Sequence, residues 1–367
     1  MSAMLRENKK EAAQIEQPDK DSNKDIVTDD IDEICRKLQR VADPTYLKTF
    51  TMAELYEQVF EGRPSIIEGL LTAGTYILAG APKLGKSFLV MQLAWHVSTG
   101  EAIWGMSVKQ GSVLYLALED DMRRLQDRLY RMFGAEATDK LHFSVYSQSI
   151  GNGLIPQLQH FIEEQPDTRL IIIDTLQKVR EVTKEQYSYA GDYAAIAELK
   201  KISDKHAVCI LLVHHTRKQQ ADDGFDMISG TSGLMGAADG ALLLRKERRT
   251  ANTASLEISG RDQQDQKLYR KGNEESLCWE LESMETEVWK EAPEPILERL
   301  ASFLDFCGQW SGSPTELVQA LGVDMKANAL TLKLNINAGR LLDEYGISYK
   351  SSRTHSGRRI ELKRDDV

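Results

Sequence analysis

A glycine-rich turn holds the residues best suited to chemistry. Its sequence, Gly80-Ala81-Pro82-Lys83-Leu84-Gly85-Lys86-Ser87, fits the pattern G-x-x-x-x-G-K-[ST] in full. A buried strand is expected before it and a helix from Phe88 to Val97 after it, so backbone N–H groups and a helix N-terminus can surround phosphate. Lys86 can reach the β- and γ-phosphates, and Ser87 can ligate Mg²⁺. The segment Gly80 to Phe88 therefore predicts binding of ATP with Mg²⁺, the alternative being a chance turn between a strand and a helix.

Acidic residues follow two apolar runs of the chain. Asp174 ends Leu170-Ile-Ile-Ile173, where a carboxylate can support the magnesium opposite the phosphate loop. Glu119 follows Val113 to Leu118, and there it could orient and deprotonate an attacking water. Each acid has an alternative role as a helix cap, and we expect Asp120 or Asp121 to cap the helix from Met122 to Phe133.

Two adjacent histidines end another apolar run, Ala207 to Val213. A polar side chain at that point could sense the γ-phosphate and relay its loss to the next loop. His214 is the first choice, although the sequence leaves open which of His214 and His215 faces the nucleotide. The alternative role for either histidine is that of a satisfied surface residue.

These residues need a scaffold, and the pattern of apolar runs predicts one. Buried strands are expected over 74–80, 113–118, 170–173, 207–213 and 240–244, at intervals that can each hold a helix. Such alternation predicts an α/β domain with a mainly parallel sheet covered on both faces. Shorter, antiparallel pieces then follow to about Trp289. We expect a charged arm over 1–45, an ATPase domain over 46–290, a linker over 291–297 and a small module over 298–367.

Composition narrows the classes of function. No apolar stretch approaches the roughly 20 residues needed to cross a bilayer, so a protein without membrane contact, in the cytoplasm, is expected. Four cysteines without paired spacing argue against a zinc site or a disulfide framework. The net charge of -10 gives no global attraction to nucleic acid, so any phosphate contact must come from a local basic patch.

The final module combines short helices with a basic hairpin. Ser313, Pro314 and Glu316 form the signature of a capped helix, and a longer helix is expected over Ala327 to Tyr345. The hairpin carries six basic residues, namely Lys350, Arg353, Arg358, Arg359, Lys363 and Arg364. This order resembles a winged-helix domain, which contacts either duplex DNA or a protein. The alternative is a solvated edge hairpin whose charges prevent aggregation.

Five motifs in order give the chain a family resemblance over about Pro64 to Arg270. They are ILAGAPKLGKSFL, LYLALEDD, LIIIDTL, LLVHHTRK and SGTSGLMGAADGALLL. The set resembles the RepA-type hexameric replicative helicases and AAA-family relatives carried on mobile elements. The resemblance implies a RecA-like core, a homo-oligomeric ring that hydrolyses ATP between subunits, and single-stranded DNA in its channel.

The resemblance also implies residue roles. Lys86 and Ser87 bind phosphate and magnesium, Glu119 activates water, Asp174 supports the metal, and His214 or His215 is a switch. In related DnaB-type helicases a lysine-x-arginine pair reaches the neighbour's γ-phosphate. Here Arg261 fits the arginine position and Ser259 replaces the lysine. The alternative for Arg261 is a surface turn residue.

A glycine- and serine-rich loop, 222–238, would face the channel in the resembling proteins. Its backbone and hydroxyl groups could hold DNA, with Arg217 and Lys218 supplying charge at its edge. Two further functions share the nucleotide residues: a DNA-binding regulator switched by ATP without unwinding, and a small-molecule kinase. The acidic strand end and the histidine pair favour water as the acceptor, so the kinase ranks last.

Overall fold

The computed structural model describes residues 45–47, 49–60, 63–180, 189–216, 224–228, 232–246, 248, 251–261, 263–285, 294–354 and 357–364. The arm before residue 45, Arg217, Lys218, parts of the glycine-rich loop and residues 291–293 lie outside them. The chain divides into two compact units, Met1–Val59 and Phe60–Val367. In the first unit, helix α3 (Met52–Glu57) begins at a capping box formed by Thr51 and Glu54.

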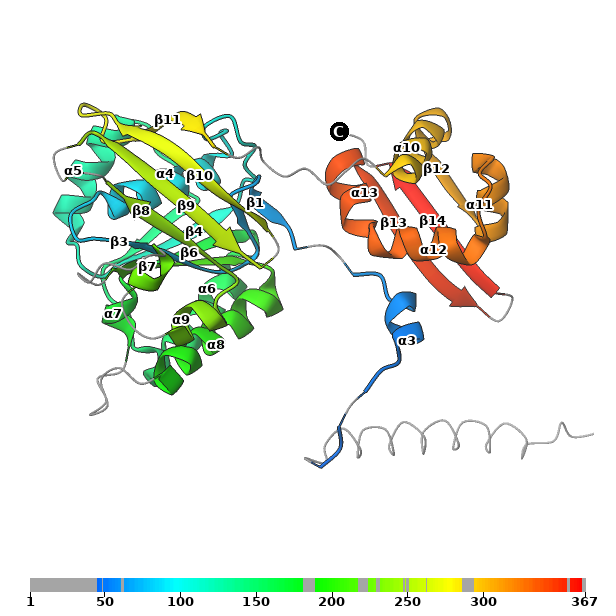
Figure 1. Cartoon of the computed structure of the whole chain (residues 1–367), viewed down its shortest axis with the longest axis horizontal. Coiled ribbons are helices and arrows are strands. Elements are labelled where there is room, and N and C mark those ends of the chain that lie inside the picture. The colour runs from blue at the N-terminus through cyan, green and yellow to red at the C-terminus, as the bar shows by residue number, and fades with distance from the viewer. Residues whose placement is uncertain are drawn as a thin grey trace, which may run out of the picture. The chain divides into compact units, whose positions relative to one another are not determined.

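A large sheet dominates the second unit (Figure 1). Among the described residues its strand order is β11-β10-β9-β8-β3-β7-β6-β4-β5. The parallel strands of this sheet are β3 (Gly74–Gly80), β4 (Ser112–Ala117), β5 (Leu141–Ser144), β6 (Thr168–Asp174), β7 (Cys209–His215) and β8 (Gly240–Arg245). The antiparallel strands β9 (Thr253–Gly260), β10 (Gln263–Gly272) and β11 (Trp279–Met284) extend the sheet beyond β8. The expected α/β fold with a mainly parallel sheet is confirmed.

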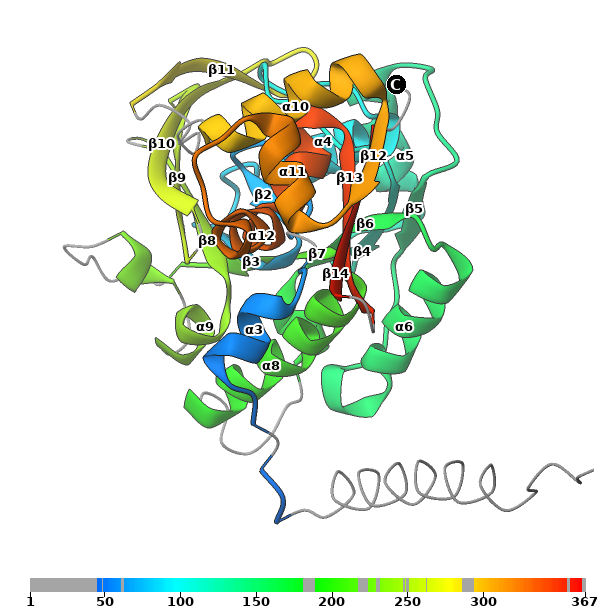
Figure 2. The ribbon, with the colours of Figure 1, turned by 90° about the vertical axis from the view of Figure 1, so that its right-hand side faces the viewer.

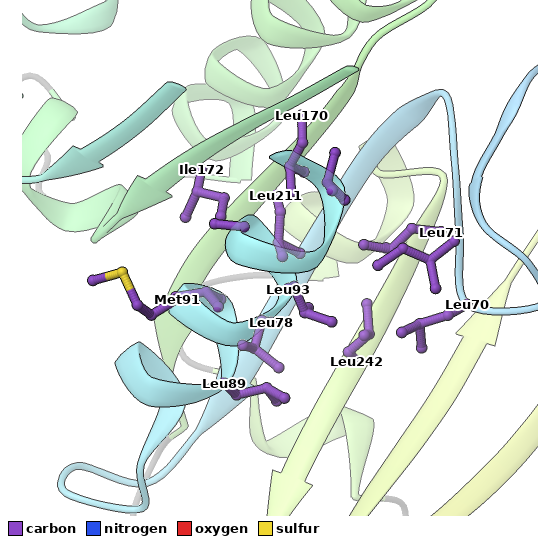
Figure 3. Close-up of a cluster of buried hydrophobic side chains, with 14 of the residues drawn as sticks. Leu70, Leu71, Leu78, Leu89, Met91, Leu93, Leu170, Ile172, Leu211 and Leu242 are labelled. Carbon is purple, nitrogen blue, oxygen red and sulfur yellow. The ribbon is translucent and has the colours of Figure 1, made fainter. Parts of the chain in front are cut away.

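Helices cover both faces of this sheet, as Figure 2 shows. One face packs on α4 (Lys86–Thr99) and α5 (Met122–Phe133). The other packs on α6 (Leu154–Glu164), α7 (Leu176–Val179), α8 (Tyr189–His206) and α9 (Ser232–Ala237). Alternate strand residues divide between these two cores, because successive side chains of a strand point to opposite faces. Figure 3 shows Leu89 and Leu93 of α4 among Leu78, Leu211 and Leu242 of the strands.

Shorter elements complete the core region. Strands β1 (Ser65–Ile67) and β2 (Leu71–Thr72) form a two-stranded sheet. Two single-turn 3-10 helices, η2 (Ile150–Asn152) and η3 (Phe225–Met227), lie in connections. In the described part of the chain, no helix has both the length and the hydropathy required to cross a membrane.

The C-terminal elements run in the order α10 (Pro295–Cys307), β12 (Gln309–Gly312), α11 (Pro314–Leu321), α12 (Ala327–Ile336), α13 (Ala338–Tyr345), β13 (Ile347–Thr354) and β14 (Gly357–Arg364). The strands form an antiparallel sheet in the order β12-β14-β13. The capping box of Ser313 and Glu316 is confirmed, with Pro314 at the first helical position.

The single helix expected over Ala327–Tyr345 is wrong, because the chain breaks into α12 and α13 at Asn337. The Asn337 amide donates to the Lys333 carbonyl at 2.8 Å and so satisfies an acceptor at the end of α12.

Candidate nucleotide-binding site

The glycine-rich turn links β3 to α4 with a backbone that requires glycine at both ends. A Cβ on Gly80 would lie 2.8 Å from the carbonyl oxygen of Leu244, so only glycine fits there. Gly85 has φ +94° and is the N-cap of α4, without a side-chain cap. The first-turn N–H groups of this 14-residue helix are therefore left for an outside acceptor, and an anion suits both these donors and the positive end of the helix dipole.

Lys86 places its ammonium group inside this turn. Its Nζ donates to the carbonyl oxygens of Gly80 at 2.7 Å and of Ala81 at 3.0 Å. Burial lowers the pKa of Lys86 to about 8, while the charges of Asp174 and Glu119 act in the opposite direction. A cation that is partly desolvated beside two carboxylates is suited to bind phosphate, which returns the solvation that burial removed.

Asp174 lies at the end of β6, buried, and within hydrogen-bond reach of two hydroxyl groups. Tyr115 donates to its Oδ2 at 2.9 Å, and the Ser87 hydroxyl also hydrogen-bonds its carboxylate. Burial raises the pKa of Asp174, and these two hydrogen bonds lower it only in part. Ser87 and Asp174, the two predicted metal residues, thus lie together, and their hard oxygen atoms form a donor set that fits Mg²⁺.

Glu119 lies one residue beyond the point where the chain leaving β4 passes Asp174. The Leu118 N–H donates to the Asp174 carbonyl at 2.8 Å, and Oε1 of Glu119 accepts from Thr175 at 3.2 Å. Residue Glu119 is exposed to solvent. Its carboxylate is therefore held near the phosphate loop and is accessible to water.

The two acids after Glu119 have structural partners. Asp121 caps α5 by accepting from the Arg124 N–H at 2.8 Å, which confirms the expected cap. Asp120 accepts from Arg128 at 2.6 Å and pairs with Arg124 at 3.1 Å. Of the three consecutive carboxylates, Glu119 is the one that these capping and ion-pair contacts leave available for chemistry.

The structure brings His215, and not the first choice His214, to Lys86. Nδ1 of His215 lies 3.4 Å from the Lys86 ammonium nitrogen, because β7 pairs with β3 so that His215 is opposite Gly80. Burial lowers the pKa of His215, and the Lys86 charge lowers it further. His214 is 4% exposed and alternates to the other face of the sheet.

Arg261 follows β9 at the opposite edge of the parallel sheet. Its N–H donates to the Asp239 carbonyl at 2.9 Å, and its guanidinium donates to Gly236. Because Gly240 pairs with Gly260 and lies beside the start of β3, Arg261 is separated from the phosphate loop by nearly the length of β3. That strand advances about 20 Å at roughly 3.3 Å per residue. Arg261 is thus outside the site of its own chain.

Sequence reasoning did not single out Tyr115, Thr175 or Trp279, all of which contact the predicted residues. Tyr115 is a hydroxyl-bearing residue in an apolar strand, and Thr175 follows the strand-ending acid, so both left a readable signal. Trp279 approaches Gly85 from β11, and its indole N–H donates to the Gly85 carbonyl at 3.4 Å. A contact between positions so far apart in sequence leaves no local pattern.

Comparison with known proteins gives one family match. Residues 42–221 match the family AAA_25, described as an AAA domain. This segment includes Lys86, Glu119, Asp174 and His215. No curated protein matches the chain.

Solved structures of low identity also match the chain. They include a phosphate-loop relative described as an ATPase domain, at 14% identity and TM-score 0.49, covering 72% of this chain and 100% of that one. A DnaB-like replicative helicase matches at 15% identity and TM-score 0.47, over 68% of this chain and 71% of that one. A KaiC-like protein of Pyrococcus horikoshii OT3 matches at 14% identity and TM-score 0.44, over 62% and 99% respectively.

Proposed function

We propose that this chain binds ATP with Mg²⁺ and hydrolyses it. The observation that carries the proposal is the convergence of Lys86 and Ser87 on Asp174, with Glu119 beside them, at the carboxyl ends of adjacent parallel strands. Ligands of α/β proteins bind at such ends. The AAA domain match over residues 42–221 supports the same assignment.

The residues divide the work by their chemistry. The backbone from Gly80 to Phe88 and the Lys86 ammonium hold the phosphates. Ser87 and Asp174 would hold Mg²⁺, which supplies neutralisation of phosphate charge. Glu119, the exposed carboxylate, orients a water molecule and accepts its proton. His215, beside Lys86, takes the switch role that the sequence assigned first to His214.

We further propose that hydrolysis occurs between subunits. Arg261 lies at the far edge of its own sheet, so it can serve only the site of an adjoining copy. A hexameric ring of such copies, in which Arg261 completes the neighbouring site, follows from this placement and from the RepA-type resemblance. An arginine supplied in this way is worth about 10³–10⁵ in turnover.

The work driven by hydrolysis is proposed to be translocation on single-stranded DNA or unwinding, in the replication of a mobile element in the cytoplasm. The C-terminal helices and basic hairpin would contact duplex DNA or a protein as a winged-helix-like module. The alternative function is an ATP-switched DNA-binding regulator without unwinding activity, for which the same nucleotide residues serve.

A fork assay separates the two functions. The chain is incubated with ATP, Mg²⁺ and a labelled forked duplex, while phosphate release is measured with and without single-stranded DNA. Strand separation together with DNA-stimulated release supports the helicase. DNA-stimulated release without any strand separation removes the helicase and leaves the regulator. The Lys86→Ala variant is the control for a contaminating enzyme, since it should give neither signal.

A further inference from the structure

The phosphate loop is held from outside by Trp279 of β11. The indole N–H donates to the carbonyl of Gly85, and a Cβ on Gly85 would lie 3.0 Å from Cζ2 of the ring. Trp279 is only 4% exposed, so this contact is packed on all sides. A movement of the loop at Gly85 must therefore move the indole or break the contact.

Gln92 fixes Trp279 to the helix that follows the loop. Its Oε1 accepts from the Trp279 N–H at 2.8 Å, and its Nε2 donates to the Trp279 carbonyl at 3.0 Å. The Trp104 indole N–H adds a third bond to that carbonyl at 2.7 Å. The side chain of Gln92 is buried, so loss of its bonds would leave a buried main-chain donor without its partner and weaken the hold on the strand.

The same strand pair leads to Arg261. Trp279 is opposite Gly272 at the end of β10, and β10 is paired along its length with β9, so the β9–β10 turn carries Arg261. Within β10, Arg270 is fully buried and its guanidinium stacks 3.1 Å from the centroid of the Trp104 ring. One continuous set of packed contacts thus joins the phosphate loop to the far edge of the sheet.

We propose that Gln92 and Trp279 are positioning residues that couple the phosphate loop to the β9–β10 hairpin, so that nucleotide binding in one subunit alters the Arg261 that it offers to the next. This inference rests on the proposed ATP binding. It assigns to the antiparallel extension of the sheet a task that neither the loop motif nor Arg261 reveals alone.

Hydrogen exchange at the hairpin tests the coupling. Exchange of the amides around Arg261 is measured in the full chain with and without ATP and Mg²⁺, and nucleotide binding is measured separately by filter retention of labelled ATP. In the wild type, ATP should change the exchange at this turn. In Gln92→Met, which keeps the side-chain length without the hydrogen bonds, ATP should still bind and that change should be lost.

Gln110→Met is the matched control. Gln110 also donates to a main-chain carbonyl of α4, that of Ser98 at 3.1 Å, but this bond lies at the far end of the helix from Trp279 and its loss should leave the response intact. Should Gln92→Met fail to fold, Trp279→Phe keeps a packed ring, lacks the indole N–H and should show the same loss.

Two outcomes overturn the coupling: an unchanged response at the turn in these variants while ATP binds, or no response in a wild type that binds ATP. A wild type that binds no ATP would instead refute the proposed function.

Discussion

The ammonium nitrogen of Lys86 lies 3.4 Å from Nδ1 of His215, across the junction of β3 and β7. Burial and the nearby positive charge both lower the pKa of this histidine, so His215 is neutral at pH 7. A neutral imidazole can accept from Lys86 and can exchange that contact when phosphate takes the ammonium. The relationship links the loop to the strand that leads into the glycine-rich segment.

The histidine pair gives a test within two adjacent residues. His215→Ala should lower turnover about 10- to 100-fold with ATP affinity retained, as expected for a group that acts between binding and chemistry. His214→Asn, a change on the opposite face of β7, should affect thermal stability more than turnover. Steady-state phosphate release and thermal melting check both variants. A turnover loss confined to His214→Asn would contradict the assignment.

Lys86 predicts a pH dependence for ATP binding. Its pKa is lowered to about 8 by burial, and bound phosphate favours the ammonium and raises that pKa again. Below pH 7 the lysine is charged before binding, so affinity should be flat. Above pH 8 binding must take up a proton, and affinity should fall about ten-fold per pH unit. Calorimetry in two buffers of different ionisation enthalpy at pH 8.5 measures the proton uptake, which should be absent at pH 6.5.

Tyr115 supports the carboxylate of Asp174 from within the sheet. Tyr115→Phe removes one of the hydrogen bonds that lower the pKa of Asp174, so the acid becomes harder to ionise. The variant should lose about 1–3 kcal/mol of stability and require more Mg²⁺ for half-maximal hydrolysis. Titration of Mg²⁺ at fixed ATP tests this. An unchanged requirement would show that Asp174 does not serve the metal.

Glu119 is separated by mutation from the acids beside it. Glu119→Gln should lower turnover about 10²–10⁴-fold while ATP still binds, because the amide cannot accept the water proton. Asp121→Asn is the matched control, since asparagine caps α5 as well as aspartate does and turnover should stay close to that of the wild type. Equal losses in both variants would indicate a structural effect at the start of α5.

The sequence predicted the parallel core because each strand there is a continuous apolar run. Strand β3 was expected with its observed bounds, and β4, β6, β7 and β8 within a few residues of theirs. Strand β5 was missed, since its four residues, Leu-His-Phe-Ser, give no clear pattern and form a strand only by pairing with β4.

The site could be predicted only as far as single strands allow. A strand-ending acid or a loop lysine is readable, but the choice between His214 and His215 depends on the pairing of β7 with β3, which no local pattern contains. The contact of Trp279 with Gly85 likewise depends on the position of β11 in the sheet. Long-range pairing, and not residue type, decided what sequence reasoning missed.

The most direct test of the account measures phosphate release by the Lys86→Ala variant, by the Arg261→Ala variant and by an equal mixture of the two. Lys86→Ala should neither bind nor hydrolyse ATP, and Arg261→Ala should bind ATP without turning it over. Mixing should restore part of the activity, because an intact loop on one chain can meet an intact Arg261 on the next. Full turnover by either variant alone would contradict a shared ATP site.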